Sequence, residues 1–269
     1  MKKLLLVPFV ALTLGSVVAC GNDEKTIVVG ASPVPHADVL NSEVVQNYVR
    51  DKGYKLEVKI YQDYITPNKA LDDGGVDANY FQHIPYLEDE VTNKGYKISA
   101  AATVHYEPLN LYSKTSISDY SNKTISIIKD VSNATRALEL LKANNIIDSY
   151  DVTDFNFLHP VYTSSKNVTI ECIDEGLLTN KVNDDGIAVI PGNFALTAWG
   201  GEGTTKYKQF GETEEVAAPK ANIIACRTSD LNSTKIDILC KALAQPGVED
   251  FIKDTFGATV VYKYEDLRK

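Results

Sequence analysis

Strand-like and helix-like segments alternate along this chain, and this alternation restricts the fold more than any other feature of the sequence. Residues 26–30 are mostly β-branched and predict a strand. Apolar residues recur every fourth position over 40–48, as on one face of a helix, and residues 56–60 alternate apolar with charged, as in a half-buried strand. Together these segments predict a βαβ unit with parallel strands and a right-handed crossover.

The same alternation continues to the C-terminus. Further helices are expected at 66–71, 85–95, 132–144, 234–243 and 248–256, and further strands at 76–80, 124–128, 168–173, 186–190 and 221–227.

A long extended stretch at 98–113 indicates a strand that leaves one lobe and enters another. We therefore expect an α/β fold of two lobes, with extended crossings near residues 109–113 and 217–224. The first lobe would comprise residues 26–110 and 224–269, and the second residues 111–223. Removing the first 20 of the 269 residues leaves 249, which suits two lobes better than one core.

The first twenty residues have the pattern of a lipoprotein export signal. Two lysines precede an apolar run at 4–19, and Cys20 follows a small residue. The run contains Pro and Gly and is shorter than the roughly 20 residues that span a bilayer, so we expect residues 1–19 to be removed as a signal peptide. Two acyl chains on Cys20 would anchor the protein stably, with residues 20–25 as a tether. The expected location is the extracytoplasmic face of the cell membrane. The alternative is a plain secretory signal.

The charge balance excludes one class of partner. Two of the 27 lysines and arginines lie in the leader, so 25 basic residues remain against 36 acidic ones, a net charge near −11. Such a surface repels nucleic acid and anionic lipid headgroups, and no nucleic-acid partner is expected.

Three cysteines follow Cys20, namely Cys172, Cys226 and Cys240, and an odd number cannot all pair within one chain. Each follows apolar residues, so buried free thiols are expected rather than a disulfide framework.

An anion-binding pattern occurs at residues 130–136. Ser132 or Asn133 would cap a helix whose first-turn N–H groups are unpaired, and Arg136 adds a planar donor fork close by. We expect a ligand carboxylate at this position. The alternative is a surface salt bridge on an ordinary capped helix.

Aromatic and histidine side chains follow the ends of predicted strands. Tyr64 precedes a helix, Phe81 and His83 follow the strand at 76–80, and His105 lies in the long extended stretch. Ligands of open α/β sheets bind at the carboxyl ends of strands, and aromatic walls suit an apolar or thioether side chain. The alternatives are core packing for the aromatic residues and capping or bridging roles for the histidines.

Two asparagines near strand ends, Asn193 and Asn222, are candidate partners for a zwitterion, which supplies both a donor and an acceptor. Backbone pairing is the alternative role.

No CxxC, HExxH, GxSxG, GxGxxG or P-loop motif occurs, so neither an enzyme nor a cofactor is expected, and a secreted hydrolase is disfavoured. The main rival is a metal-binding protein that uses His36, His83 and His105 with a carboxylate such as Glu107, because imidazole suits zinc.

Six blocks of sequence resemble the methionine-binding lipoproteins of ABC importers, the MetQ/NlpA family. The likeness runs from about Ile27 to the C-terminus with the blocks in order. They are Gly30–His36 (GASPVPH), Asp63–Leu71 (DYITPNKAL), Asp77–Leu87 (DANYFQHIPYL), Val104–Ser113 (VHYEPLNLYS), Ser132–Leu138 (SNATRAL) and Ala221–Ala225 (ANIIA).

The resemblance implies a periplasmic-binding-protein-like fold of type II, whose two lobes close on an amino acid, usually D- or L-methionine. Such a protein delivers its ligand to a permease driven by an ATPase, without catalysis. By resemblance, Arg136 holds the carboxylate, Asn222 bonds the zwitterion, and the side-chain pocket is lined by Tyr64, Phe81, His83 and His105.

One position departs from the family. Where many members have Val-Ile-Asn, this chain has Val189-Ile190-Pro191. The ligand contact of that asparagine is therefore missing or is supplied by Asn193, two positions further on.

Overall fold

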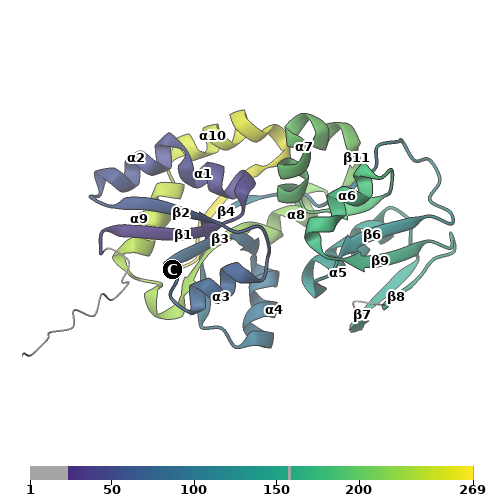
Figure 1. The fold of residues 1–269 in the computed structure, drawn as a ribbon, viewed down its shortest axis with the longest axis horizontal. Helices are drawn as coiled ribbons and strands as arrows, with labels where there is room; N and C mark the ends of the chain where they lie inside the picture. The colour runs from purple at the N-terminus through teal and green to yellow at the C-terminus, as the bar shows by residue number, and fades with distance from the viewer. Residues whose placement is uncertain (1–23, 157–158, 269) are drawn as a thin grey trace, which may run out of the picture.

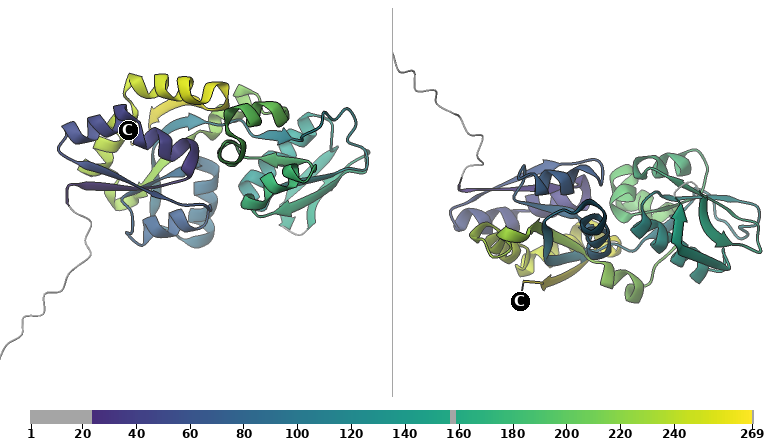
Figure 2. Two further views of the ribbon diagram at one scale, coloured as in Figure 1. Left: turned by 45° about the horizontal axis from the view of Figure 1, so that its top comes forward. Right: turned by 90° about the horizontal axis from the view of Figure 1, so that it is seen from below.

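A computed structural model describes residues 24–156 and 159–268, which form two α/β lobes (Figure 1). The predicted signal peptide and Cys20 lie outside these residues. Figure 2 shows the lobes side by side from two further directions. Each lobe is built on one large sheet, and the chain passes between these two sheets through residues 107–109 and again through residues 212–221. We call these segments the two crossings.

The first lobe is built on a six-stranded mixed sheet. In spatial order its strands are β13 (Val261–Asp266), β4 (Ile98–Tyr106), β12 (Asn222–Arg227), β3 (Ala78–His83), β1 (Thr26–Ala31) and β2 (Lys55–Ile60). Strands β1, β2 and β3 are parallel, which confirms the predicted βαβ unit. Strand β12 runs antiparallel between β3 and β4, so it places Asn222 opposite both His83 and His105.

The second lobe is built on a five-stranded sheet. In spatial order its strands are β11 (Lys208–Gly211), β5 (Asn110–Tyr112), β10 (Ala188–Ile190), β6 (Thr124–Ile128) and β9 (Thr169–Ile173). A two-stranded hairpin of β7 (Ser149–Asn156) and β8 (His159–Thr163) extends from this lobe (Figure 1).

Helices cover both faces of each sheet. Their bounds are α1 (Asp38–Asn41), α2 (Glu43–Asp51), α3 (Thr66–Asp72), α4 (Ile84–Lys94), α5 (Val131–Ala143), α6 (Leu178–Asn183), α7 (Gly192–Tyr207), α8 (Glu214–Ala217), α9 (Thr234–Leu243) and α10 (Pro246–Phe256). On the six-stranded sheet, α1, α2, α9 and α10 bury one face and α3 and α4 the other. On the five-stranded sheet, α5 packs on one face and α6 and α7 on the other.

Two predicted elements differ from the structure, and for the first of them the cause is local. The helix expected from the pattern at residues 40–48 is divided into α1 and α2, because Ser42 is extended (φ −57°, ψ 146°) and its hydroxyl donates to the Val39 carbonyl oxygen over 2.7 Å. The strand expected at 76–80 lies later, at β3. By contrast, α4 ends as predicted at Gly95, which adopts the left-handed conformation (φ 72°) that closes helices.

Helix α7 was not predicted, and it joins the two lobes. Its hydrophobic positions do not follow one face, and Gly200 (φ 63°) interrupts its helical geometry. Leu196 of α7 packs in the core of the first lobe, whereas Ala195 packs in an aromatic cluster that also contains Ile190 of the second sheet. Among the helices within the described ranges, none has the length and apolar character needed to cross a bilayer.

The three described cysteines are free thiols, as expected from the sequence. Cys226 and Cys240 are fully buried, and Cys172 is half-buried. Burial raises the pKa of Cys172 and Cys226 to about 11 and that of Cys240 to about 12.

We expect these thiols to react slowly in the native protein. At pH 8 roughly one thiol in a thousand is ionised when its pKa is about 11, and only the thiolate reacts. Ellman's reagent, applied to protein in which Cys20 is replaced by alanine, should label the folded chain slowly and all three thiols rapidly in guanidinium chloride. Cys172→Ser should remove the fastest of the native phases. Rapid labelling of three thiols before denaturation would contradict the buried positions.

Candidate functional site

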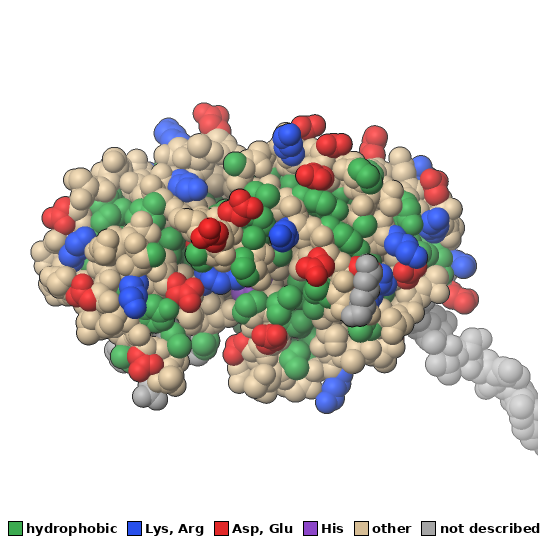
Figure 3. All heavy atoms as spheres, turned by 180° about the vertical axis from the view of Figure 1, so that it is seen from behind, with side chains coloured by type: hydrophobic (Ala, Val, Ile, Leu, Met, Phe, Trp, Pro, Cys, Tyr) green, Lys and Arg blue, Asp and Glu red, His purple; other side chains and the backbone are tan. Residues whose placement is uncertain are grey.

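The candidate site lies where the carboxyl ends of strands from both lobes face each other. Strand β3 ends at His83, β6 leads into α5, which carries Arg136, and β10 leads into α7, which carries Asn193. A narrow cavity lies between these ends, and its volume accessible to water is about 20 Å³. Figure 3 shows the notch between the lobes, with basic side chains at its inner end.

Six of the predicted site residues line this cavity: Tyr64, Phe81, His83, Arg136, Asn193 and Asn222. Sequence analysis did not name five others as lining residues: Gln82, Tyr86, Asn133, Pro191 and Gly192. Glu107 also lines it, and the sequence suggested that residue only as a metal ligand.

One wall of the cavity is aromatic. The Tyr64 ring lies 5.7 Å from the Phe81 ring, 5.9 Å from the Tyr86 ring and 5.2 Å from the Phe194 ring, measured between centroids. The Tyr64 hydroxyl donates to Asn193 Oδ1 across the two lobes over 2.7 Å. The wall therefore offers an apolar surface with one polar end, as an amphipathic ligand requires.

His83 is held by partners on both ring nitrogens. It caps α4, because its Nδ1 accepts from the Tyr86 N–H over 3.2 Å, and that leaves the proton on Nε2, 3.0 Å from Asn133 Oδ1. Burial, and then the charge of Arg136, lower the pKa of His83 to about 4, so the ring is neutral at pH 7.

The cap of α5 is Asp130, not Ser132 or Asn133 as expected. Its carboxylate accepts from the Asn133 N–H over 2.7 Å and from the Asn133 side-chain amide. Because the Asn133 side-chain NH₂ group points to Asp130, its side-chain oxygen Oδ1 points to His83. The sequence contains the capping signal, but it does not say which of the polar residues Asp130, Ser132 and Asn133 adopts the extended conformation.

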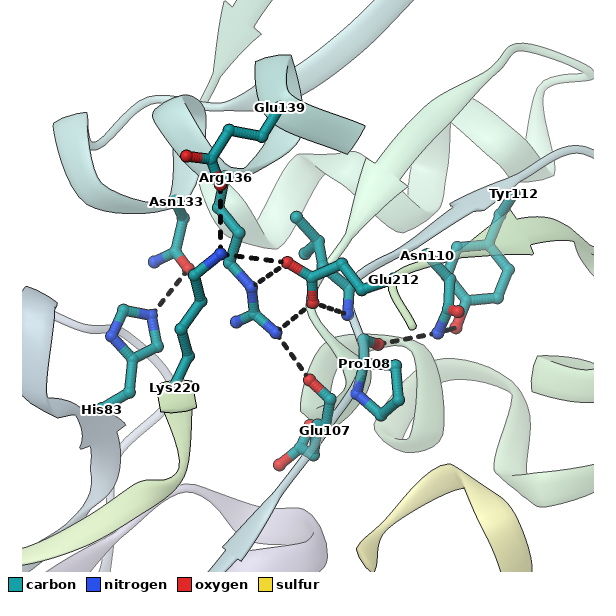
Figure 4. Close-up of polar contacts among 11 residues, drawn as sticks. His83, Glu107, Pro108, Asn110, Tyr112, Asn133, Arg136, Glu139, Glu212 and Lys220 are labelled. Atoms are coloured by element: carbon teal, nitrogen blue, oxygen red, sulfur yellow. Dashed lines mark hydrogen bonds and ion pairs between the residues drawn. The ribbon is translucent and has the colours of Figure 1, made fainter. Parts of the chain in front are cut away.

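Arg136 is buried and paired with Glu212. Its Nε donates to Glu212 Oε1 over 2.6 Å, and its Nη2 donates to Glu212 Oε2 over 2.5 Å and to the Glu107 carbonyl oxygen over 2.8 Å. Figure 4 shows the guanidinium between these acceptors. The alternative of a surface salt bridge is wrong, because the Arg136 side chain is 7% exposed and that of Glu212 1%. A ligand carboxylate at Arg136 stays a prediction, and Nη1 is the nitrogen that makes no hydrogen bond to a described residue.

The Arg136–Glu212 pair also holds the two crossings together. Glu212 Oε2 accepts from the Leu109 N–H over 2.8 Å, and the Glu212 N–H donates to the Leu109 carbonyl oxygen over 2.9 Å. Lys220 lies 3.5 Å from Glu212 Oε1 and 3.1 Å from Glu139 Oε2. Glu212 is 76 residues from Arg136 in the sequence, and no local pattern marks it.

His105 does not line the cavity, which corrects its expected place in the pocket wall. It is fully buried behind Glu107, with Nε2 2.9 Å from Glu107 Oε1 and Nδ1 bonded to the Tyr80 hydroxyl. Burial lowers the pKa of His105 to about 3. Burial and the neighbouring His105 lower that of His36 to about 4, and burial raises the pKa of Glu107.

The predicted set of three histidines for a metal does not form. His36, His105 and Glu107 place ligand atoms within 4.8 Å of one another, whereas His83 is bonded to Asn133 and Tyr86 as described. The metal alternative with His36, His83 and His105 is therefore wrong in its ligand set.

The two candidate asparagines lie in different kinds of element, Asn222 in a strand and Asn193 in a helix. Asn222 lies in β12, with backbone neighbours on both sides, and its Oδ1 lies 3.1 Å from His36 Nε2. Asn193 is in the first turn of α7, which approaches Glu107 so closely that a Cβ at Gly192 would collide with Glu107 Oε2. A side chain at residue 192 would therefore displace the Glu107 carboxylate.

A wider groove of about 950 Å³ opens elsewhere on the surface, between α8 and β13. Its rim carries Glu214, Glu215 and Glu265. The narrow cavity between the lobes is the better candidate, because buried polar groups from both lobes converge on it.

Comparison with known proteins identifies the family. The model of the NlpA lipoprotein family matches residues 27–263, so the chain belongs to this family. It is 36% identical to the methionine-binding lipoprotein MetQ of Bacillus subtilis, over 97% of this chain and 98% of that protein. It is 29% identical to the D-methionine-binding lipoprotein MetQ of Escherichia coli K12, over 91% of this chain and 92% of that protein.

Solved structures agree with the two-lobe, periplasmic-binding-protein-like fold. A nutrient binding protein from Burkholderia cenocepacia bound to methionine superposes with a TM-score of 0.79 at 32% identity, over 88% of this chain and 99% of that one. A periplasmic substrate-binding protein of an ABC transporter from Coxiella burnetii gives a TM-score of 0.78 at 29% identity, over 88% and 100%.

The buried pair predicts that Arg136→Ala destabilises the ligand-free protein. Removing one partner leaves the Glu212 carboxylate buried with less compensation, which costs about 3–5 kcal/mol of unfolding free energy. Urea unfolding measures this loss. Arg50→Ala, on the exposed face of α2 with Asn47 as partner, is the matched control and should cost less than about 1 kcal/mol. Equal losses in the two variants would contradict the importance of the pair, and Arg136→Met with Glu212→Gln should recover part of the loss.

Proposed function

We propose that this member of the NlpA lipoprotein family is the substrate-binding protein of an ABC importer. It would capture an amino acid between its lobes and deliver it to a permease driven by an ATPase, without catalysis. The observation that carries the proposal is the cavity itself, which combines a buried guanidinium, asparagine side chains and an aromatic wall. We propose methionine as the ligand, as the names of the relatives suggest.

The roles follow from the chemistry of the walls. Arg136 would donate from Nη1 to the ligand carboxylate, in a cleft where water is excluded and the hydrogen bond is strong. Asn193 and Asn222 would complete the polar end. The thioether of methionine would pack on Tyr64, Phe81 and Tyr86, because sulfur contacts aromatic rings favourably.

Ligand entry requires the lobes to separate. The cavity of about 20 Å³ holds roughly one water molecule, which is far less than an amino acid needs. Opening would break the contacts between lobes, such as those of Tyr64 with Asn193 and of His83 with Asn133. We propose that the crossings act as the hinge and that the lobes comprise residues 26–110 with 224–269, and residues 111–223.

Attachment to the membrane would come from Cys20. A diacylated cysteine tethers a protein that has no spanning helix among its described residues, and it would place the cleft on the extracytoplasmic face of the cell membrane.

We expect L-methionine to stabilise the protein once carried-over ligand has been removed. A ligand that binds only the native state adds about 2.7 kcal/mol at one hundred times its dissociation constant. Thermal melting with each of the twenty amino acids and with methionine dipeptides measures the effect. L-Glutamate and L-lysine are controls, because their charged side chains would be buried against the aromatic wall. Equal melting temperatures throughout would rule out the proposal.

A second variant tests the anchor. Cys20→Ala should release the protein from the membrane fraction and leave methionine binding unchanged, since Cys20 is outside the lobes. Fractionation with a high-salt wash, followed by immunoblotting, gives the distribution. Retention of the variant in the washed membranes would refute the lipid anchor.

A further inference from the structure

The side-chain amide oxygens that line the cavity already have hydrogen-bond donors. The pairs are Asn133 Oδ1 with His83 Nε2 at 3.0 Å, Asn193 Oδ1 with the Tyr64 hydroxyl at 2.7 Å, Asn222 Oδ1 with His36 Nε2 at 3.1 Å and Gln82 Oε1 with Asn68 Nδ2 at 2.8 Å. Each amide oxygen keeps a second lone pair but carries no formal charge, so a carboxylate among the lining residues is the stronger acceptor for an ammonium group.

Glu107 is the carboxylate that lines the cavity. It is 6% exposed, its Oε1 lies 2.9 Å from His105 Nε2 and 3.9 Å from His36 Nε2, and it accepts the Asn193 N–H of α7. The backing imidazoles fix the position of the carboxylate, and Tyr80 in turn fixes His105.

The arginine and lysine side chains near Glu107 form ion pairs with other carboxylates and not with Glu107. Arg136 uses two nitrogens on Glu212, and Lys220 lies between Glu212 and Glu139. The guanidinium contributes a longer-range attraction to Glu107, but its hydrogen bond goes to the Glu107 backbone carbonyl, not to the carboxylate. A buried carboxylate without a hydrogen-bonded cation is costly, and a bound cation removes that cost.

The positions of Glu107 and Arg136 fit an α-amino acid. Because Arg136 Nη2 donates to the Glu107 carbonyl oxygen over 2.8 Å, the cation and the carboxylate belong to adjacent parts of one wall. An α-amino acid carries its carboxylate and its ammonium on the same carbon atom, so both charges meet an opposite charge at once.

We propose that Glu107 binds the α-ammonium group of the ligand and makes a free α-amine a condition of tight binding. His36, His105 and Tyr80 act as positioning residues behind it. The cleft then rejects N-acylated amino acids, and it rejects peptides with methionine at the carboxyl end. In both classes the α-nitrogen next to the carboxylate-bearing carbon is part of an uncharged amide. This inference rests on the proposed function and names the ligand class within it.

Calorimetric titration of three ligands tests the proposal: L-methionine, N-acetyl-L-methionine and 4-(methylthio)butanoate, which lacks only the amine. The wild-type protein should prefer methionine to the other two by at least about thirtyfold, the usual effect of removing one partner of a buried charge pair. In Glu107→Gln this preference should collapse toward one, because methionine loses affinity and 4-(methylthio)butanoate does not.

Glu90→Gln is the matched control. Glu90 is a buried glutamate of α4 that does not line the cavity, and this variant should keep the wild-type preference. The wild-type measurements need no variant to fold, so equal binding of methionine and N-acetyl-L-methionine overturns the proposal by itself. An unchanged preference in a folded Glu107→Gln protein overturns it too.

Two further results separate the possible failures. If wild-type protein stripped of ligand binds none of the three compounds, the proposed function fails. If methionine binding disappears with a chelator and returns with Zn²⁺, Glu107 is a metal ligand with His36 and His105 and the ammonium assignment is overturned. Binding that is unaffected by the chelator supports the assignment.

Discussion

The buried ion pair of Arg136 and Glu212 is the interaction on which the arrangement of the two lobes depends. It lies where both crossings meet, and it joins the first turns of α5 to the backbone of Leu109 and Glu107. Burying two charges carries a large desolvation cost, and here that cost is offset by backbone hydrogen bonds and by the ammonium of Lys220. The pair therefore fixes the direction of the guanidinium before any ligand arrives, which is the preorganisation that strong binding requires.

The other polar groups of the cleft are paired with one another. Tyr64 bonds Asn193 and His83 bonds Asn133, each across the lobes, so the closed cleft leaves few polar atoms unsatisfied. A ligand gains only the difference between its own hydrogen bonds and those it replaces. Selectivity therefore depends most on groups whose interaction with the ligand is stronger than the interaction it replaces. Glu107 is such a group, because an ammonium would give its carboxylate a hydrogen-bonded cation, which no described residue supplies.

Much of the fold could be predicted from local patterns, since they act over short distances. Alternating residues in β2 and the left-handed Gly95 after α4 determine those elements by themselves. Strand order could not be predicted in this way, because the place of β12 between β3 and β4 depends on packing of both faces and not on its own sequence. Helix α7 was missed for a related reason: Gly200 breaks its geometry, and its apolar residues face two different cores.

The candidate site also has a part that local sequence predicts and a part that it does not. Residues that follow strand ends, such as His83 and Asn193, could be expected near the cleft because the topology brings those ends together. Their partners could not, since the role of a side chain is decided by what its second polar atom meets. His105 and His83 are the same residue type in similar positions, yet one supports a carboxylate behind the cavity and the other caps α4 and orients Asn133. The acceptor inventory of the closed cleft supplies this missing information, and it directs attention from the asparagines to Glu107.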